Sequence, residues 1–108
     1  MSFFDLKDFP SKHLFPGFEG KIFHTDQITL SYWEIKAGSI LPEHSHFHEQ
    51  TTHVLSGELE LIIENESKIL SPGQFAIIPS NAKHSGIAHT DCVVLDTFTP
   101  VREDYKQL

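Results

Sequence analysis

From residue 28 onward, short segments of β-branched, aromatic and alternating residues are separated by turn-forming residues at close intervals. This pattern is typical of an antiparallel sandwich or barrel, because side chains alternate between the two faces of a strand. The predicted strands span residues 28–35, 44–46, 50–56, 58–64, 67–70, 74–78, 83–88 and 92–99. The fold class is therefore all-β, with little room for helix.

The first 27 residues have a different character, with six phenylalanines, two prolines and two glycines. We expect residues 1–27 to form an irregular segment that packs on the barrel formed by residues 28–108. In a homodimer, the same segment would instead cover the barrel of the partner. A chain of 108 residues suits one domain, because it can supply only one sizeable core.

Charge and composition exclude several classes of partner. The net charge is −7 and the eight Lys and Arg residues are scattered, so we expect no nucleic-acid binding. The apolar runs are too short to span a bilayer, and the start lacks the basic and apolar regions of a signal peptide. A single cysteine, Cys92, fits a reducing compartment, where its expected role is that of a small buried hydrophobic residue. We therefore expect a cytoplasmic protein that binds a small molecule.

Histidine is the unusual component of the sequence, with eight residues among 108. His44 and His46 are two positions apart, so on a strand their imidazoles face the same side, and Gln50 follows after a short bend. His84 comes just after a turn that contains Asn81. Imidazole nitrogens bind Zn, Ni, Cu, Mn and Fe, and an amide oxygen is a harder, neutral ligand. The spacing therefore predicts one divalent metal ion held by His44, His46, Gln50 and His84.

The other histidines have simpler interpretations. His48 lies in the bend and either lines the mouth of the site or adds a ligand, whereas His53 is out of phase with Gln50 and should face the opposite side. Surface or hydrogen-bonding roles suffice for His13, His24 and His89. Gln50 either binds the metal directly or holds a water molecule on it.

Two spaced motifs resemble those of the cupin family. Gly38-x5-His44-x-His46-x3-Gln50-x6-Gly57 is similar to the first cupin motif, with Gln50 in the place of the usual Glu. Gly73-x5-Pro79-x-Asn81-x2-His84 is similar to the second, with Asn81 at a Gly position whose left-handed turn Asn tolerates. This resemblance implies a single-domain jelly-roll β-barrel, a double-stranded β-helix, with the metal inside its mouth.

A narrower resemblance involves the last strand and the tail. Asp96 and Phe98 share a face, and Arg102 follows; from the pattern alone, Asp96 could simply cap a turn and Arg102 could pair with Glu103 or Asp104. Together with residues 44–50, however, this segment resembles the small cupins of pectin and alginate breakdown. These proteins convert 4,5-unsaturated uronates into the linear keto form. The resemblance implies catalytic roles for Asp96, Phe98 and Arg102.

The function implied by this resemblance is that of a metal-dependent sugar isomerase or tautomerase. In this scheme Arg102 grips the carboxylate of an anionic sugar and Asp96 moves a proton, and the metal is Ni, Zn, Mn or Fe because no redox change is needed. Two other functions stay open. One is a metal-dependent cupin dioxygenase with a redox-active metal, and the other is a non-catalytic cupin that binds a small molecule or keeps a mainly structural metal.

Overall fold

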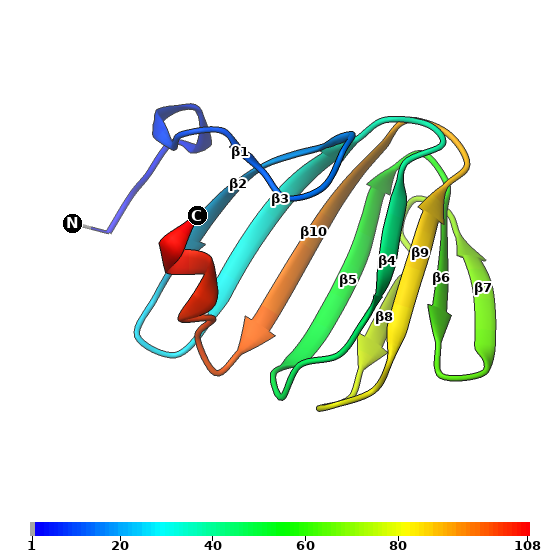
Figure 1. The fold of residues 1–108 in the computed structure, drawn as a ribbon. Coiled ribbons are helices and arrows are strands. Elements are labelled where there is room, and N and C mark those ends of the chain that lie inside the picture. Colours follow the sequence, from blue (N-terminus) through cyan, green and yellow to red (C-terminus); the bar gives the residue numbers. More distant parts are fainter. Residues whose placement is uncertain (1) are drawn as a thin grey trace.

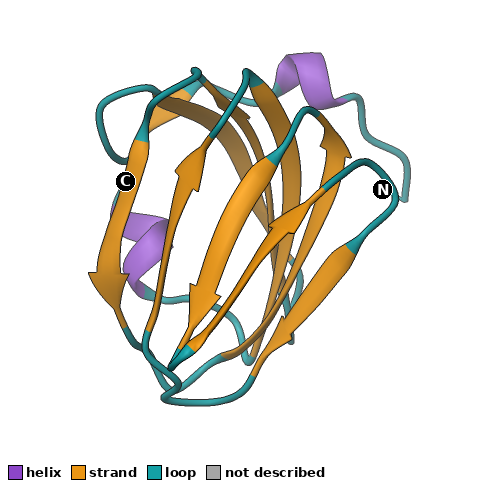
Figure 2. Ribbon diagram, turned by 90° about the vertical axis from the view of Figure 1, so that its right-hand side faces the viewer, coloured by secondary structure: helices purple, strands orange, loops and turns teal. Residues whose placement is uncertain are grey.

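The computed structural model describes residues 2–108, which form two antiparallel sheets stacked as layers (Figure 1). The larger sheet has the strand order β1-β2-β3-β10-β5-β8, and the smaller sheet has the order β4-β9-β6-β7. The elements are η1 (Leu6–Asp8), β1 (Lys12–His13), β2 (Phe18–His24), β3 (Thr29–Ile35), β4 (Ile40–His44), β5 (Glu49–Ser56), β6 (Leu59–Ile63), β7 (Glu66–Leu70), β8 (Phe75–Ile78), β9 (His84–Ala88), β10 (Cys92–Thr99) and η2 (Asp104–Gln107). Viewed from the side, the strands of both layers curve around a common interior (Figure 2). The all-β jelly-roll prediction is confirmed.

Seven of the predicted strands are present as β3 and β5 to β10, with ends within about a residue of the expected positions. The prediction of irregular chain was wrong for residues 18–24, because these form β2 and pair in register with β3. Gly20 makes this pairing possible, since a Cβ atom there would lie 2.3 Å from the ring of Trp33. The leading segment also contributes Phe18 to the core.

The strand predicted at residues 44–46 begins and ends earlier, at Ile40–His44. Pro42 lies inside this strand, although proline usually interrupts the hydrogen bonding of a sheet. It is tolerated because β4 is an edge strand that pairs only with β9, so a missing N–H costs no second ladder. The pairing is irregular between Leu41 and His44. As a result His44 is the last residue of the strand, and His46 lies in the loop that follows.

The core lies between the two sheets, and its character changes along β5 and β10. At one end the inward pair is apolar, with Val94 opposite Val54. The next inward pair is polar, with Asp96 opposite Thr52, and Phe98 then lies opposite Gln50. Polar residues thus replace core residues at one end of the sandwich, next to the segment that carries the histidines.

The remaining local predictions concern a turn, the cysteine and membrane insertion. Asn81 adopts a left-handed conformation with φ 67°, as expected for its place in the second motif. Cys92 is buried, as expected. Among residues 2–108, no helix has the length and hydropathy needed to cross a membrane.

Candidate functional site

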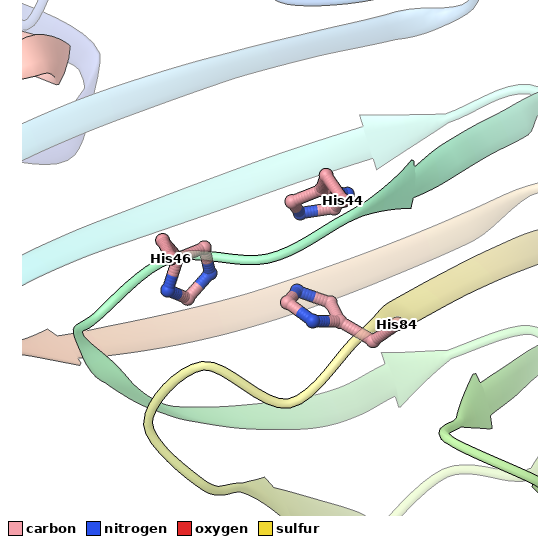
Figure 3. Close-up of side chains that lie close together, drawn as sticks. All are labelled: His44, His46 and His84. Atoms are coloured by element: carbon pink, nitrogen blue, oxygen red, sulfur yellow. The ribbon is translucent and has the colours of Figure 1, made fainter.

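Three histidines converge at the polar end of the sandwich. His44 ends β4 and His84 begins β9, and the register of these two strands places them directly opposite each other. Their ring centroids are 4.1 Å apart, and the ring of His46 lies 5.0 Å from that of His84. The possible ligand atoms of all three lie within 4.8 Å of one another, and the rings point toward a common space (Figure 3).

Backbone carbonyl groups determine which nitrogen of each histidine ring carries the proton. His44 Nδ1 lies 2.8 Å from the Pro42 carbonyl, His46 Nδ1 lies 3.1 Å from that of His48, and His84 Nδ1 lies 2.9 Å from that of Ala82. A carbonyl oxygen only accepts hydrogen bonds, so each Nδ1 carries the proton and donates it. Each Nε2 of a neutral ring therefore presents a lone pair, which is the form that binds metals.

Two atoms in this cluster lack an ordinary hydrogen-bonding partner. His84 Nε2 is buried without one, and burial lowers the pKa of this ring to about 4, so it stays neutral at physiological pH. His46 Nε2 faces Gln50 Oε1 at 3.0 Å, although both atoms are acceptors when His46 carries its proton on Nδ1. Burial, followed by the charge of Arg102, also lowers the pKa of His46. Converging lone pairs in a partly buried site fit a divalent cation, so three imidazoles and one amide oxygen could hold one.

The other histidines are placed elsewhere. His48 is buried beside His46 and stacks on Phe47, but it does not belong to the three-histidine cluster; its carbonyl orients His46 instead. His53 faces the opposite side of β5 from Gln50, as predicted, and stacks on Phe75. The remaining three are peripheral: His13 is exposed, His24 bonds to Thr29 and His89 pairs with Glu60.

A cavity of about 320 Å³ opens beside the cluster. His44 and Gln50 line it together with the three residues predicted to be catalytic, Asp96, Phe98 and Arg102. Its deeper wall is made of core side chains such as Trp33, Leu61 and Val94. The structure thus places two of the four predicted metal ligands, His44 and Gln50, at one cavity with the predicted catalytic residues.

Asp96 projects from β10 into this cavity. Its Oδ1 accepts a 2.8 Å hydrogen bond from the hydroxyl of Thr52. Burial raises the pKa of Asp96 from 3.8 to about 6, against the opposing effects of the Thr52 and Gln50 hydrogen bonds and of Arg102. A carboxyl group with a pKa close to physiological pH can both accept and release a proton.

Arg102 is held from three directions. Its Nε and Nη2 donate to both carboxylate oxygens of Asp104, at 3.1 and 2.6 Å. Its guanidinium lies 3.8 Å from the ring centroid of Tyr105 and 4.8 Å from that of Phe98. The backbone N–H donates to Thr29 on β3. The expected pairing of Arg102 with Asp104 does occur, but the arginine is buried rather than part of a hydrated tail. This pairing leaves Nη1 and one proton of Nη2 free to donate to another anion.

Sequence reasoning missed two residues at this site, Thr52 and Tyr105, and named Asp104 only as one of two alternative partners of Arg102. Thr52 shares strand parity with Gln50, two positions away, and that signal could have found it. Asp104 and Tyr105 belong to a short 3-10 helix in the tail, for which no periodic pattern was visible.

The fold, the histidine cluster and the motif spacing together define a class. The chain belongs to the cupin family: the model for the cupin domain matches residues 31–98. The chain is 30% identical over 99 residues to the pectin degradation protein KdgF of Dickeya dadantii, covering 89% of this chain and 90% of that protein. It is also similar to the structure of KdgF from a Halomonas species, with a TM-score of 0.90, 30% identity and coverage of 97% and 98%. An RmlC-like cupin from Shewanella frigidimarina has the same fold, with a TM-score of 0.91, 22% identity and coverage of 97% and 96%.

Proposed function

We propose that this protein is a metal-dependent enzyme that opens and ketonises 4,5-unsaturated uronates. The observation that carries the proposal is the shared cavity, which is lined by the Asp96 carboxyl group, the Arg102 guanidinium and two candidate metal ligands, His44 and Gln50. Similarity to two KdgF proteins, one of them described as a pectin degradation protein, supports a substrate from acidic polysaccharides.

The reaction is an isomerisation, in which one proton leaves the anomeric hydroxyl while the bond between C1 and the ring oxygen breaks. One proton is then added at C4 of the former double bond, so that an aldehyde and a ketone replace the ring. Asp96 is the group that moves this proton, because its pKa of about 6 allows both protonation states near neutral pH.

Arg102 binds the uronate carboxylate through the guanidinium edge that Asp104 leaves free. A cationic donor group matters at this point, because the chain as a whole carries a charge of −7, which repels an anionic sugar. Phe98 forms an apolar wall between the guanidinium and His46, whose ring centroid lies 5.7 Å from its own.

His44, His46, His84 and the Gln50 amide would hold the cation, which is Ni, Zn, Mn or Fe. When bound, such an ion supplies Lewis-acid polarisation of a substrate oxygen. All four ligands are neutral, so the charge of the ion favours an anionic substrate.

The test uses purified protein loaded with each of these metals and a freshly prepared unsaturated uronate. Loss of the conjugated absorbance and proton NMR of the linear product should show a rate above that of the spontaneous reaction. The same rate is expected with and without oxygen, because no oxidant takes part. A requirement for oxygen would instead indicate the dioxygenase alternative, and the absence of acceleration with every metal would contradict the proposal.

We also propose that the protein is a cytoplasmic homodimer. Apolar side chains support a second copy as partner: Phe75 and Ile77 on the edge strand β8 are 56% and 57% exposed, and Phe3 on the leading segment is 91% exposed. Light scattering should give twice the mass of the 12.3 kDa chain at micromolar concentration, and the monomer mass would contradict the assembly.

A further inference from the structure

A chain of hydrogen bonds runs from the candidate metal centre to Asp96. The Gln50 amide nitrogen donates to the Thr52 hydroxyl at 2.9 Å, and that hydroxyl donates to Asp96 Oδ1 at 2.8 Å. The Oε1 atom of Gln50 faces His46 at the other end. Gln50 and Thr52 are 5% and 3% exposed, so water cannot easily replace either partner.

The direction of each hydrogen bond follows from the chemistry of the groups. A threonine hydroxyl has one proton, and the carboxylate of Asp96 can only accept it. Because its only proton is donated to Asp96, the Thr52 oxygen can only accept from the Gln50 amide, and an amide donates only through its nitrogen. If the amide were rotated by half a turn, its oxygen would face the lone pairs of the Thr52 oxygen and its nitrogen would point at the histidines.

We propose that Thr52 is the positioning residue of the metal centre: its hydroxyl, oriented by Asp96, fixes the Gln50 amide with Oε1 toward His46 and its neighbours. This inference rests on the proposed metal-dependent function. It also explains why Gln replaces the usual Glu of the motif at position 50. A glutamate there would compete with Asp96 for the single proton of Thr52, and one of the two carboxylates would stay unsatisfied.

The strand offers a matched control. Thr51 is the adjacent residue on β5 but faces the other side of the sheet, where its hydroxyl bonds to Thr97. Thr51→Val therefore removes the same group from the same strand without touching the chain from Gln50 to Asp96. Thr52→Ser keeps the hydroxyl, whereas Thr52→Val keeps the shape and loses it.

The experiment measures binding of Co²⁺ alone by calorimetry and by the visible absorption of the loaded protein, which reports the ligand set. We expect Thr52→Val to weaken Co²⁺ binding about 10- to 100-fold and to change the spectrum, as is typical for loss of a group that orients a ligand. Thr52→Ser and Thr51→Val should bind like the wild type. In a Gln50→Ala background, Thr52→Val should have no further effect, because Thr52 acts through Gln50.

Three results would overturn the inference. These are wild-type affinity in Thr52→Val, equal weakening in Thr52→Ser, and an undiminished effect of Thr52→Val in the Gln50→Ala background. Circular dichroism of the metal-free proteins checks folding, and Thr52→Ala takes the place of Thr52→Val if the latter does not fold. Failure of the wild type itself to bind Co²⁺ would contradict the proposed metal centre, a result visible before any variant is compared.

Discussion

Asp96→Asn should separate the stability of this protein from its activity. The fold raises the pKa of Asp96 from 3.8 to about 6, chiefly because the carboxylate is buried. Each pKa unit corresponds to about 1.4 kcal/mol, so ionised Asp96 destabilises the native state by about 3 kcal/mol at most. The asparagine side chain has nearly the same shape, keeps an oxygen that accepts from Thr52 and carries no charge.

The sign of the pH dependence follows from proton binding. Between pH 3.8 and about 6 the native state binds the Asp96 proton more tightly than the unfolded state, so this group lowers stability as the pH rises through that interval. Below the interval both states are protonated and the penalty disappears. Asp96→Asn should therefore be about 1 to 3 kcal/mol more stable than the wild type above pH 6, the lower figure allowing for an unpaired amide N–H. Near pH 3.8 most of this advantage should be gone.

Urea unfolding followed by circular dichroism, with EDTA present, measures these differences. The other titratable groups are the same in both proteins, so their contributions largely cancel in the comparison. Asp26→Asn is the matched control, since Asp26 is exposed in the turn before β3 and its charge is hydrated in both states. An Asp96→Asn protein that is less stable than the wild type by the same amount at every pH would refute the reasoning. The same variant should lose the proposed activity while its metal content stays unchanged.

Three further outcomes are expected. Arg102→Lys keeps the charge but loses the planar fork, so KM for the uronate should rise at least about 10-fold with a smaller change in kcat in steady-state kinetics; a change in kcat alone would argue against its role in binding. The double variant with His44→Ala and His46→Ala should lose its metal in elemental analysis, and unchanged metal content would exclude the cluster as the binding site. Gly57→Ala should cost about 2 kcal/mol or more in urea unfolding, because φ is 79° and the new Cβ would lie 2.0 Å from the Asp91 carbonyl; wild-type stability would show that the turn can adapt.

The strands that could be predicted are those whose own residue pattern and flanking turn residues identify them. In β5, β6 and β10, inward-facing and outward-facing residues alternate in a segment that is bounded by turn-forming residues, so the local sequence is enough to predict each strand. β2 was missed because Gly20 and the neighbouring aromatic residues looked irregular, and the reason for Gly20 is the ring of Trp33, which a local pattern does not contain. The predicted bounds of β4 were shifted because proline normally indicates the end of a strand. Pro42 is compatible with β4 only because this strand lies at an edge of its sheet, which the sequence does not reveal.

The residues of the candidate site also fall into those that the sequence could predict and those that depend on the tertiary structure. The spacing of the two motifs could identify the histidines, because it is matched to a strand pairing that places His44 opposite His84. The partner of Arg102 depends on how a short tail folds back over the cavity, and alternation says nothing about it. Thr52 lies between these cases, since its face was predictable and its hydrogen bonds were not.

The four candidate metal ligands do not belong to one layer. His44 and His84 lie on strands of the smaller sheet, Gln50 lies on the larger sheet, and His46 lies on the loop between them. A bound ion would therefore cross-link the two halves of the sandwich, in a chain whose single cysteine cannot form an internal disulfide. At a free-metal concentration of 100 times Kd, this link would add about 2.7 kcal/mol to the free energy of unfolding. Depletion of the metal would then loosen the mouth of the fold as well as stop its chemistry, and the cellular lifetime of the protein would follow metal supply.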